Sequence, residues 1–337
     1  MIYKAIRPLL FTLDAETAHG LALRALKLGI APHAPRAPAS LRRSILGLQF
    51  PNPVGLAAGF DKHGEVPDAA LRLGFGFVEI GSVTPRPQPG NPRPRVFRAT
   101  LDHAIVNRLG FNSQGHEVVY RRLAAREQNG IVGVNLGANR DSDDRIAEYV
   151  AGVRRFAGVA SYLTVNISSP NTKGLRDLQE KEALTRLLSM VAGARAQAAP
   201  HPPILVKIAP DLDDDALHGI AETAIALGID GIIATNTTIA RDGIRDQRIA
   251  KEEGGVSGRP LFEPSTHILK RLREIAGRRL VLVGVGGIDS PEATRAKLAA
   301  GADLVQLYTG MVYEGPGLPA RIVRALADDL QRTPARS

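Results

Sequence analysis

One hexapeptide of hydrogen-bonding side chains, Asn166-Ile-Ser-Ser-Pro-Asn171, has the residue types and spacing to do chemistry. It follows the apolar run from Tyr162 to Val165, which predicts a strand. Pro170 ends that strand, because proline has no N–H group and a fixed φ. Two amides and two hydroxyls therefore gather where a strand gives way to a loop. Such a place suits the recognition of a small polar ligand and the movement of protons.

Any nucleophile or acid–base group must be a residue other than cysteine, because the chain has no cysteine. This absence excludes disulfides, thiolate metal sites and cysteine catalysis, and it is compatible with a reducing compartment. The sequence predicts no metal site. The chain has 337 residues, 44% of them hydrophobic but only 4% aromatic, so aliphatic side chains must build the core. This length falls within the range of one extended α/β barrel.

Positive charge is concentrated near the N-terminus. The chain has a net charge of +9, and residues 1–43 contain seven basic and two acidic residues, a net +5. Basic chains suit nucleic acids or anionic membrane surfaces. A charge gathered at one end, and not spread over a barrel, favours a membrane surface and predicts no nucleic-acid partner. No apolar run of about 18 residues is present, so no bilayer span is expected. The N-terminus also lacks the pattern of a secretory signal.

Two short helices are expected before the main domain. Apolar residues recur at helical spacing over residues 2–11 and 15–28. Asp14 is the expected N-cap of the second helix, and Gly29 its expected stop. A linker rich in Pro and Ala follows. We therefore expect residues 1–40 to form a helical segment that lies on a membrane surface, with its linker, and residues 41–337 to form the main domain. Simple packing of both helices on that domain is the alternative.

The main domain alternates strand-like and helical patterns. Eight apolar runs predict strands at Val54–Ala58, Phe77–Ile80, Ile131–Leu136, Tyr162–Asn166, Ile204–Ile208, Gly231–Thr235, Leu280–Val283 and Leu304–Tyr308. Helical patterns lie between them, for example over residues 143–156 and 180–197. Ser290 followed by Pro291 predicts an N-cap with proline in the first turn. Eight βα units in series indicate an α/β fold, a (β/α)8 TIM barrel with a small N-terminal helical appendage. We expect residues 85–94 and 241–258 to be long loops at its mouth.

Polar residues follow five of the predicted strands. They are Ala57-Ala-Gly-Phe-Asp-Lys62, Asn135, Asn166, Lys207 and Thr235-Asn-Thr237. For any single residue, ordinary hydrogen bonding at a barrel mouth is the simpler explanation. The carboxyl ends of barrel strands converge, however, so the set predicts one ligand pocket. Carboxamides offer a donor and an acceptor together and match a lactam or imide edge. Such groups come from Asn107, Asn166, Asn171 and Asn236.

Two glycine-containing turns follow the last two predicted strands. They are Gly284-Val-Gly-Gly287 and Tyr308-Thr-Gly310. Glycines let backbone N–H groups approach phosphate oxygens, and barrels often bind phosphate after strands 7 and 8. One such turn is weak evidence, but two at these strands predict a phosphate site.

The ordered set of motifs resembles the quinone-dependent (class 2) dihydroorotate dehydrogenases. The resemblance covers nearly the whole chain. Its motifs are Ala57-Ala-Gly-Phe-Asp-Lys62, Gly81-Ser-Val-Thr-Pro-Arg-Pro-Gln-Pro-Gly-Asn91, Asn107-Arg-Leu-Gly-Phe-Asn112, Asn166-Ile-Ser-Ser-Pro-Asn171, Gly255-Val-Ser-Gly258 and Gly284-Val-Gly-Gly-Ile-Asp289. It implies an FMN-containing barrel that oxidises dihydroorotate to orotate in pyrimidine synthesis and passes electrons to a membrane quinone.

The resemblance also implies site residues. FMN is expected to contact Ala58, Gly59, Phe60, Asp61, Lys62, Ser82, Asn135, Asn166, Lys207, Thr235, Gly258, Gly287, Tyr308 and Thr309. Substrate is expected to contact Lys62, Asn107, Arg108, Leu109, Gly110, Phe111, Asn166, Asn171, Asn236 and Thr237. Ser169 aligns with the catalytic base, Thr172 is expected to join a proton relay through water, and Lys207 is expected to stabilise charge on the reduced ring.

The N-terminal helices are expected by the same resemblance to form a quinone entrance. His19 and Arg98 should line it, with Tyr308 near its inner end; an ordinary surface or capping role is the alternative for His19. The Ala- and Arg-rich composition and the short N-terminus indicate a bacterial protein, and the resemblance implies that it binds peripherally to the cytoplasmic face of the inner membrane.

Three other functions compete with quinone-dependent dihydroorotate oxidation. A flavin-dependent tRNA dihydrouridine synthase would suit the positive charge, but such enzymes use a cysteine as the acid. A cytosolic class 1 dihydroorotate dehydrogenase would carry cysteine where Ser169 stands and would lack residues 1–40. A non-catalytic membrane-associated barrel is disfavoured, because the polar residues at the strand ends are all present.

Overall fold

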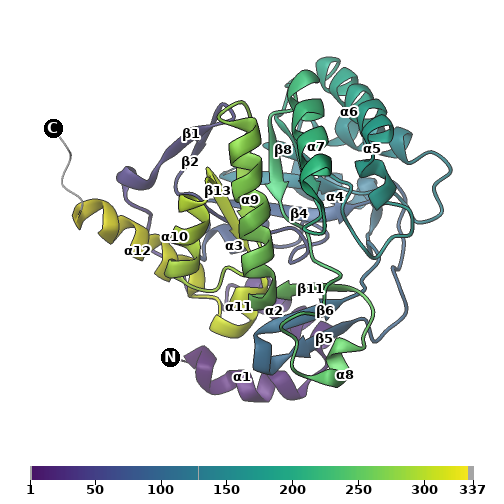
Figure 1. Ribbon diagram of the computed structural model, residues 1–337. Coiled ribbons are helices and arrows are strands. Elements are labelled where there is room, and N and C mark those ends of the chain that lie inside the picture. The colour runs from purple at the N-terminus through teal and green to yellow at the C-terminus, as the bar shows by residue number, and fades with distance from the viewer. Residues whose placement is uncertain (1, 128, 333–337) are drawn as a thin grey trace.

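Eight parallel strands close into a barrel at the centre of the molecule. The structure is a computed structural model that describes residues 2–127 and 129–332. Neighbouring strands follow one another in chain order, and the last pairs with the first (Figure 1). They are β3 (Val54–Leu56), β4 (Phe77–Val83), β7 (Ile131–Leu136), β8 (Tyr162–Asn166), β9 (Ile204–Ile208), β10 (Gly231–Ala234), β12 (Val281–Val285) and β13 (Leu304–Leu307). The predicted (β/α)8 barrel is confirmed.

Helices cover the outside of the barrel. They are α3 (Pro67–Leu71), α4 (Gly115–Ala124), α5 (Arg145–Phe156), α6 (Lys181–Ala196), α7 (Asp214–Ala226), α9 (Phe262–Ala276), α10 (Pro291–Ala299) and α12 (Leu318–Arg332). Side chains of Asp144, Asp213 and Ser290 accept hydrogen bonds from the first-turn N–H groups of α5, α7 and α10. These caps fix where each helix begins. Ser290 with Pro291 behaves as predicted.

The amino end of the barrel is filled with large side chains. The hairpin of β1 (Arg43–Ile45) and β2 (Leu48–Phe50) places the buried Phe50 edge-on to Phe77, with 5.2 Å between ring centroids. Room for these rings comes from glycines. A Cβ at Gly55 would lie 2.3 Å from the ring of Phe77, and one at Gly133 would lie 2.1 Å from the ring of Tyr162. Any ligand space must therefore lie at the carboxyl end of the strands.

A small antiparallel sheet stands at that carboxyl end. It contains β5 (Val96–Ala99), β6 (Ala104–Asn107) and β11 (Gly255–Gly258). Residues 241–258 belong to the long connection from β10 to α9, as predicted, but this connection also contains α8 (Gln247–Ala250) and β11, which the sequence did not predict. The sequence of β11 has no strand pattern. It pairs with β6 because glycines let the two backbones approach: a Cβ at Gly258 would lie 2.2 Å from the carbonyl oxygen of His103.

The N-terminal helices α1 (Ile2–Thr12) and α2 (Ala15–Lys27) lie beside this sheet. Helix α1 runs along the lower edge of Figure 1, and α2 packs against β5. The side chain of Asp14 caps α2 as predicted, and Gly29 follows with a φ of +71°. The carboxylate of Glu16 in α2 bonds to Arg93 and to the buried Arg95, so α2 is held against the barrel mouth. Within the described residues, no helix has the length and apolar character needed to cross a membrane.

Candidate functional site

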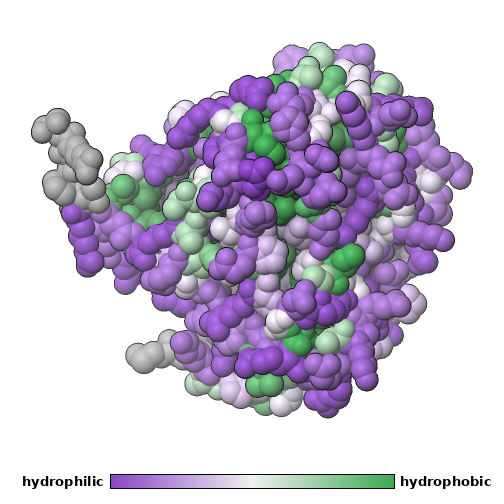
Figure 2. Space-filling view, viewed as in Figure 1, coloured by the Kyte–Doolittle hydropathy of each residue, from purple (hydrophilic) through white to green (hydrophobic). Residues whose placement is uncertain are grey.

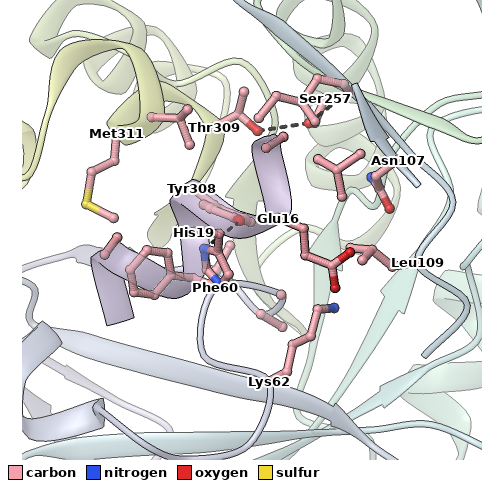
Figure 3. A pocket seen from close by; sticks show the side chains of 18 of the residues that line it. Glu16, His19, Phe60, Lys62, Asn107, Leu109, Ser257, Tyr308, Thr309 and Met311 are labelled. Atoms are coloured by element: carbon pink, nitrogen blue, oxygen red, sulfur yellow. Dashed lines mark hydrogen bonds between the residues drawn. The ribbon is translucent and has the colours of Figure 1, made fainter. Parts of the chain in front are cut away.

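One continuous cavity of about 920 Å³ lies between α1–α2 and the carboxyl ends of the barrel strands. Its walls come from α2, from the loops after β3 and β6, and from the ends of β8, β9, β10, β12 and β13. Figure 3 shows side chains from α2, from the loop after β3, from the end of β6, from β11 and from the residues after β13 converging on the same space. The strand-end residues that the sequence singled out are thus brought together by closure of the barrel.

A chain of amides forms the polar end of the cavity. Ser82 donates a hydrogen bond to Oδ1 of Asn135, and Nδ2 of Asn166 donates to the same oxygen at 3.1 Å. The other end of the Asn135 amide donates to the buried carboxylate of Glu79 at 2.8 Å. An ionised carboxylate only accepts hydrogen bonds, so Glu79 fixes which end of Asn135 faces the other two residues.

The amide chain continues toward the opening hexapeptide. Nδ2 of Asn236 lies 3.2 Å from Oδ1 of Asn166 and 3.0 Å from Oγ of Ser168. Nδ2 of Asn171 donates to Oδ1 of Asn107 at 3.2 Å, which joins the loop after β8 to the end of β6. These carboxamides line one wall and offer both donors and acceptors to a small planar ligand.

Two lysines bring positive charge to this polar end. Burial lowers the pKa of Lys207, and the negative charge of Glu79 opposes that shift. Among the described residues, the Lys207 ammonium has no hydrogen-bond acceptor. Burial, followed by the charge of Arg95, lowers the pKa of Lys62 to about 8, while Glu16 acts in the opposite direction. Figure 3 shows the Lys62 ammonium on the side of the cavity where Glu16 lies. Both ammonium groups are available to an electron-rich ligand.

Glycine turns form a second, concave end. Gly286 and Gly287 have φ values of +117° and +72°, in the left-handed region that favours glycine. A Cβ at Gly287 would lie 2.4 Å from the Cβ of Phe262. The hydroxyl of Thr309 donates to Oγ of Ser257 at 2.8 Å, which ties the end of β13 to β11. Backbone of this shape suits an anionic oxygen cluster such as a phosphate.

Ser169 lies in the cavity wall and is nearly buried. Its Oγ accepts a 3.3 Å hydrogen bond from the backbone N–H of Asn171. Among the described residues, no carboxylate or imidazole is hydrogen-bonded to this oxygen. A proton acceptor for the Ser169 hydroxyl must therefore come from solvent or from a ligand.

An aromatic cluster separates the polar end from the N-terminal helices. The phenol oxygen of Tyr308 lies 3.5 Å from Nδ1 of His19, and the ring of Phe60 packs edge-on against both (Figure 3). Burial lowers the pKa of His19 to about 4. Arg98 holds the end of α1 through the carbonyl oxygen of Leu13 at 2.8 Å, and its guanidinium lies over the ring of Phe11. Beyond this cluster the cavity is lined by the apolar side chains of α1 and α2.

Most predicted site residues line the cavity. They are His19, Ala58, Gly59, Phe60, Lys62, Ser82, Arg98, Asn107, Leu109, Gly110, Phe111, Asn166, Ser169, Asn171, Lys207, Thr235, Asn236, Thr237, Gly258, Gly287, Tyr308 and Thr309. His19 is therefore no ordinary surface histidine.

Four predicted residues do not line it. Asp61 is fully buried, and its carboxylate accepts backbone N–H groups of the following loop, so it shapes that loop and makes no side-chain contact with the cavity. Arg108 turns away to pair with Glu252 at 2.6 Å. Asn135 acts only through the neighbours described above. Thr172 is buried behind the wall.

Several lining residues escaped the sequence analysis. Ser257 and Gln306 are examples, and Glu16 of α2 is another. Ser257 lay within a quoted motif, so its hydroxyl was a usable signal. Gln306 lies inside an apolar strand pattern, where nothing in the sequence indicates that β13 turns this side chain to the cavity. Glu79, beneath the amide chain, is hidden in the same way within β4.

Comparison with known proteins agrees with this geometry. The family model described as "Dihydroorotate dehydrogenase" matches residues 40–330. A protein of Rhizobium etli named dihydroorotate dehydrogenase (quinone) is 57% identical over 333 residues, covering 97% of this chain and 92% of its own. A Brucella ovis protein of the same name is 57% identical over 327 residues, covering 95% and 90%.

The chain belongs to the quinone-dependent dihydroorotate dehydrogenases. Among solved structures, the dihydroorotate dehydrogenase of Eimeria tenella in complex with ferulenol is 37% identical and has a TM-score of 0.90. That match covers 96% of this chain and 95% of the other. The ligand-free form from the same organism is 39% identical, with a TM-score of 0.90. Membership of this family makes the chain an enzyme, an oxidoreductase, and so rules out a non-catalytic barrel. The near full-length matches to quinone-dependent enzymes rule out a tRNA dihydrouridine synthase and a class 1 enzyme.

Proposed function

We propose that the chain oxidises dihydroorotate to orotate with FMN bound in the cavity, and that a membrane quinone receives the electrons. The observation that carries the proposal is the continuity of one cavity. It runs from the amide chain and Lys207 at the strand ends to the apolar walls of α1 and α2. A polar substrate and an apolar acceptor therefore have access to one buried space.

The residues present fit FMN on grounds of their own chemistry. Lys207 is a buried residue that lines the cavity, and its ammonium has no hydrogen-bond acceptor among the described residues. Oε1 of Gln306 and Oγ1 of Thr237 are buried without a partner in the same part of the chain. Buried polar groups normally have partners. A ligand with ring carbonyls and N–H groups would satisfy them, and the glycine turn at Gly286 and Gly287 would receive a phosphate. Bound FMN would supply the hydride acceptor and the means to pass electrons on singly or in pairs.

The chain's own residues would then hold the substrate and move its proton. The carboxamides of Asn107, Asn171 and Asn236 would bind the pyrimidine ring edge. Oγ of Ser169 would take the proton from C5 as the hydride leaves C6, so that the carbon–carbon double bond of orotate forms. A serine hydroxyl is a weak base and needs a further acceptor. Thr172, behind the wall, would act only through an intervening water. Lys207 would stabilise negative charge that develops beside it.

The N-terminal segment would bring the enzyme to its acceptor. We propose that residues 1–40 form a segment that lies on an anionic membrane surface and leads quinone to the cluster of His19, Phe60 and Tyr308. Exposed apolar side chains of this segment support the proposal. They are Ile6, Leu9, Leu13, Leu21, Leu28 and Ile30. Figure 2 shows apolar side chains at the lower edge of the molecule, where α1 lies. The cytoplasmic face of a bacterial inner membrane is the proposed location.

The direct test is an assay of the purified protein with dihydroorotate and three acceptors. A quinone should support turnover, whereas fumarate and NAD should not. Visible absorbance and mass spectrometry of the released cofactor should identify FMN. Turnover with fumarate or NAD at rates matching those with quinone would contradict the acceptor assignment.

Removal of residues 1–40 should abolish quinone reduction and vesicle binding, and survival of both would assign the segment another role.

A further inference from the structure

Lys297 on α10 is the most deeply buried lysine that the proposed function does not use. Its side chain is 0% exposed. Nζ donates to Oγ of Ser265 at 2.6 Å, lies 3.5 Å from the carbonyl oxygen of Phe262 and faces that residue's ring. Burial lowers the pKa of Lys297 to about 7, and the negative charge of Glu263 opposes that shift. No salt bridge joins Lys297 to an acidic side chain among the described residues. A buried ammonium without a carboxylate partner is costly.

The surroundings of Lys297 place it directly behind the glycine turn of the cavity. α9 and α10 lie side by side (Figure 1), and the two partners of Nζ, Ser265 and Phe262, both belong to α9. These two residues back the turn. A Cβ at Gly286 would lie 2.5 Å from Oγ of Ser265, and one at Gly287 would lie 2.4 Å from the Cβ of Phe262. One layer of atoms thus separates the ammonium group from the backbone that faces the cavity.

Packing alone does not account for a lysine at this position. A methionine of similar length would fill the space and contact the ring of Phe262 without the cost of burying a charge. The hydrogen bond to Ser265 offsets only part of that cost. An anion held on the other side of the turn would offset much more, because a charge pair in a low-dielectric interior interacts strongly even through one layer of atoms.

We propose that Lys297 is a positioning residue whose buried charge makes the Gly286–Gly287 turn selective for a phosphorylated ligand. The inference rests on the proposed binding of FMN and specifies how the site distinguishes it from riboflavin, the same ring system without phosphate. The ammonium acts by contacting Ser265 and Phe262, which pack against the turn, and by electrostatic attraction of an anion bound on the other side of the turn. The ammonium contacts neither the flavin ring nor the substrate.

The test starts from the purified holoenzyme and lets its bound flavin exchange with a mixture of FMN and riboflavin. Purified protein is equilibrated with an excess of both, separated from free flavin and denatured, and the two released flavins are quantified by chromatography. Lys297→Met should lower the bound FMN-to-riboflavin ratio by about tenfold or more, as expected for loss of one charge near a phosphate in a medium of intermediate dielectric. The amount of riboflavin bound in the absence of FMN should stay the same, because the ring site is untouched.

The matched control is Lys270→Met. Lys270 lies on the exposed face of the same helix α9, so this variant removes an equal charge on the solvent side. Its FMN-to-riboflavin ratio should equal that of the unmodified protein. If Lys297→Met does not retain flavin, Lys297→Gln, which keeps a hydrogen bond to Ser265, takes its place in the same competition.

The outcomes separate the two proposals. A ratio for the Lys297 variant within threefold of the unmodified protein, or an equal fall in Lys270→Met, overturns the role of Lys297 and leaves the proposed function standing. Equal weakening of both flavins likewise overturns it, because that result indicates a structural role. Failure of the unmodified protein to bind any flavin overturns the proposed function and this inference together.

Discussion

The phenol oxygen of Tyr308 lies 3.5 Å from Nδ1 of His19, although 289 positions separate the two residues in the chain. Tyr308 directly follows β13 and His19 belongs to α2, so this contact is where the barrel meets the N-terminal segment. Burial holds the pKa of His19 at about 4. The imidazole is therefore neutral at pH 7, and the contact is a neutral hydrogen-bond pair at the boundary between the polar and apolar ends of the cavity.

Replacement of Tyr308 by phenylalanine should slow quinone reduction selectively. The variant removes the hydroxyl that faces His19 but keeps the ring that packs on Phe60. We expect turnover with quinone to fall by about tenfold, the effect of one lost hydrogen bond of about 1 kcal/mol or slightly more. Reduction of the bound flavin by dihydroorotate, followed by stopped-flow absorbance, should be unchanged. Tyr120→Phe, on the outer helix α4, is the control. Equal slowing of both half-reactions would rule out a role confined to the quinone side.

Ser169→Ala should lose the proton-transfer step and keep the cofactor. A positioned base contributes about 10²–10⁴-fold in rate, so flavin reduction by dihydroorotate should slow by at least about 10²-fold. The flavin content should stay the same, because Oγ of Ser169 has only the backbone N–H of Asn171 as a partner within the described residues. Rapid-mixing measurements of flavin bleaching provide the check. Near-normal bleaching rates would remove Ser169 from the catalytic assignment.

Exposed leucines of the N-terminal segment should govern membrane binding. Leu9 and Leu28 are 72% and 74% exposed, so their replacement by glutamine should leave stability nearly unchanged. Sedimentation with anionic vesicles should fall by about tenfold or more. The reason is that full burial of one leucine side chain stabilises binding by about 1.5–3 kcal/mol. Dihydroorotate oxidation with a soluble dye as acceptor should persist. Met190→Gln, a 52% exposed residue on α6, should bind vesicles normally. Undiminished sedimentation of the double variant would contradict the proposed membrane face.

Stability should decline as the pH falls from 7 to 5. Burial lowers the pKa values of His19, His63 and His116 from 6.5 to about 4. Between about pH 6.5 and 4, the unfolded chain therefore binds protons at these histidines and the folded chain does not. Each histidine with a lowered pKa thus reduces the free energy of unfolding as the pH falls below 6.5. For His116 alone the loss between pH 7 and 5 is about 2 kcal/mol. Urea unfolding at the two pH values measures it. His116→Phe should be less sensitive to acid than the unmodified protein, and equal sensitivity would assign the decline to other groups.

The sequence by itself determined the barrel and most of the cavity wall. Periodic apolar runs separated by helical patterns are a local signal, and parallel strands with helical crossovers have few ways to close. The strand ends were therefore identified from spacing alone, and Asn166, Lys207 and Asn236 lie where that reasoning expected them. The N-cap residues Asp14 and Ser290 were equally readable, because capping depends on a few neighbouring residues.

Only the tertiary structure decided which of these residues face the cavity and what stands behind them. Asp61 and Lys62 are adjacent in sequence, yet the first binds loop N–H groups in the interior and the second reaches the cavity. Glu79 and Lys297 were invisible as functional groups, because their partners Asn135 and Ser265 come from other elements. The cost of burying a charge, and the group that offsets it, depend on atoms brought together across the chain, so no local pattern in the sequence contains them.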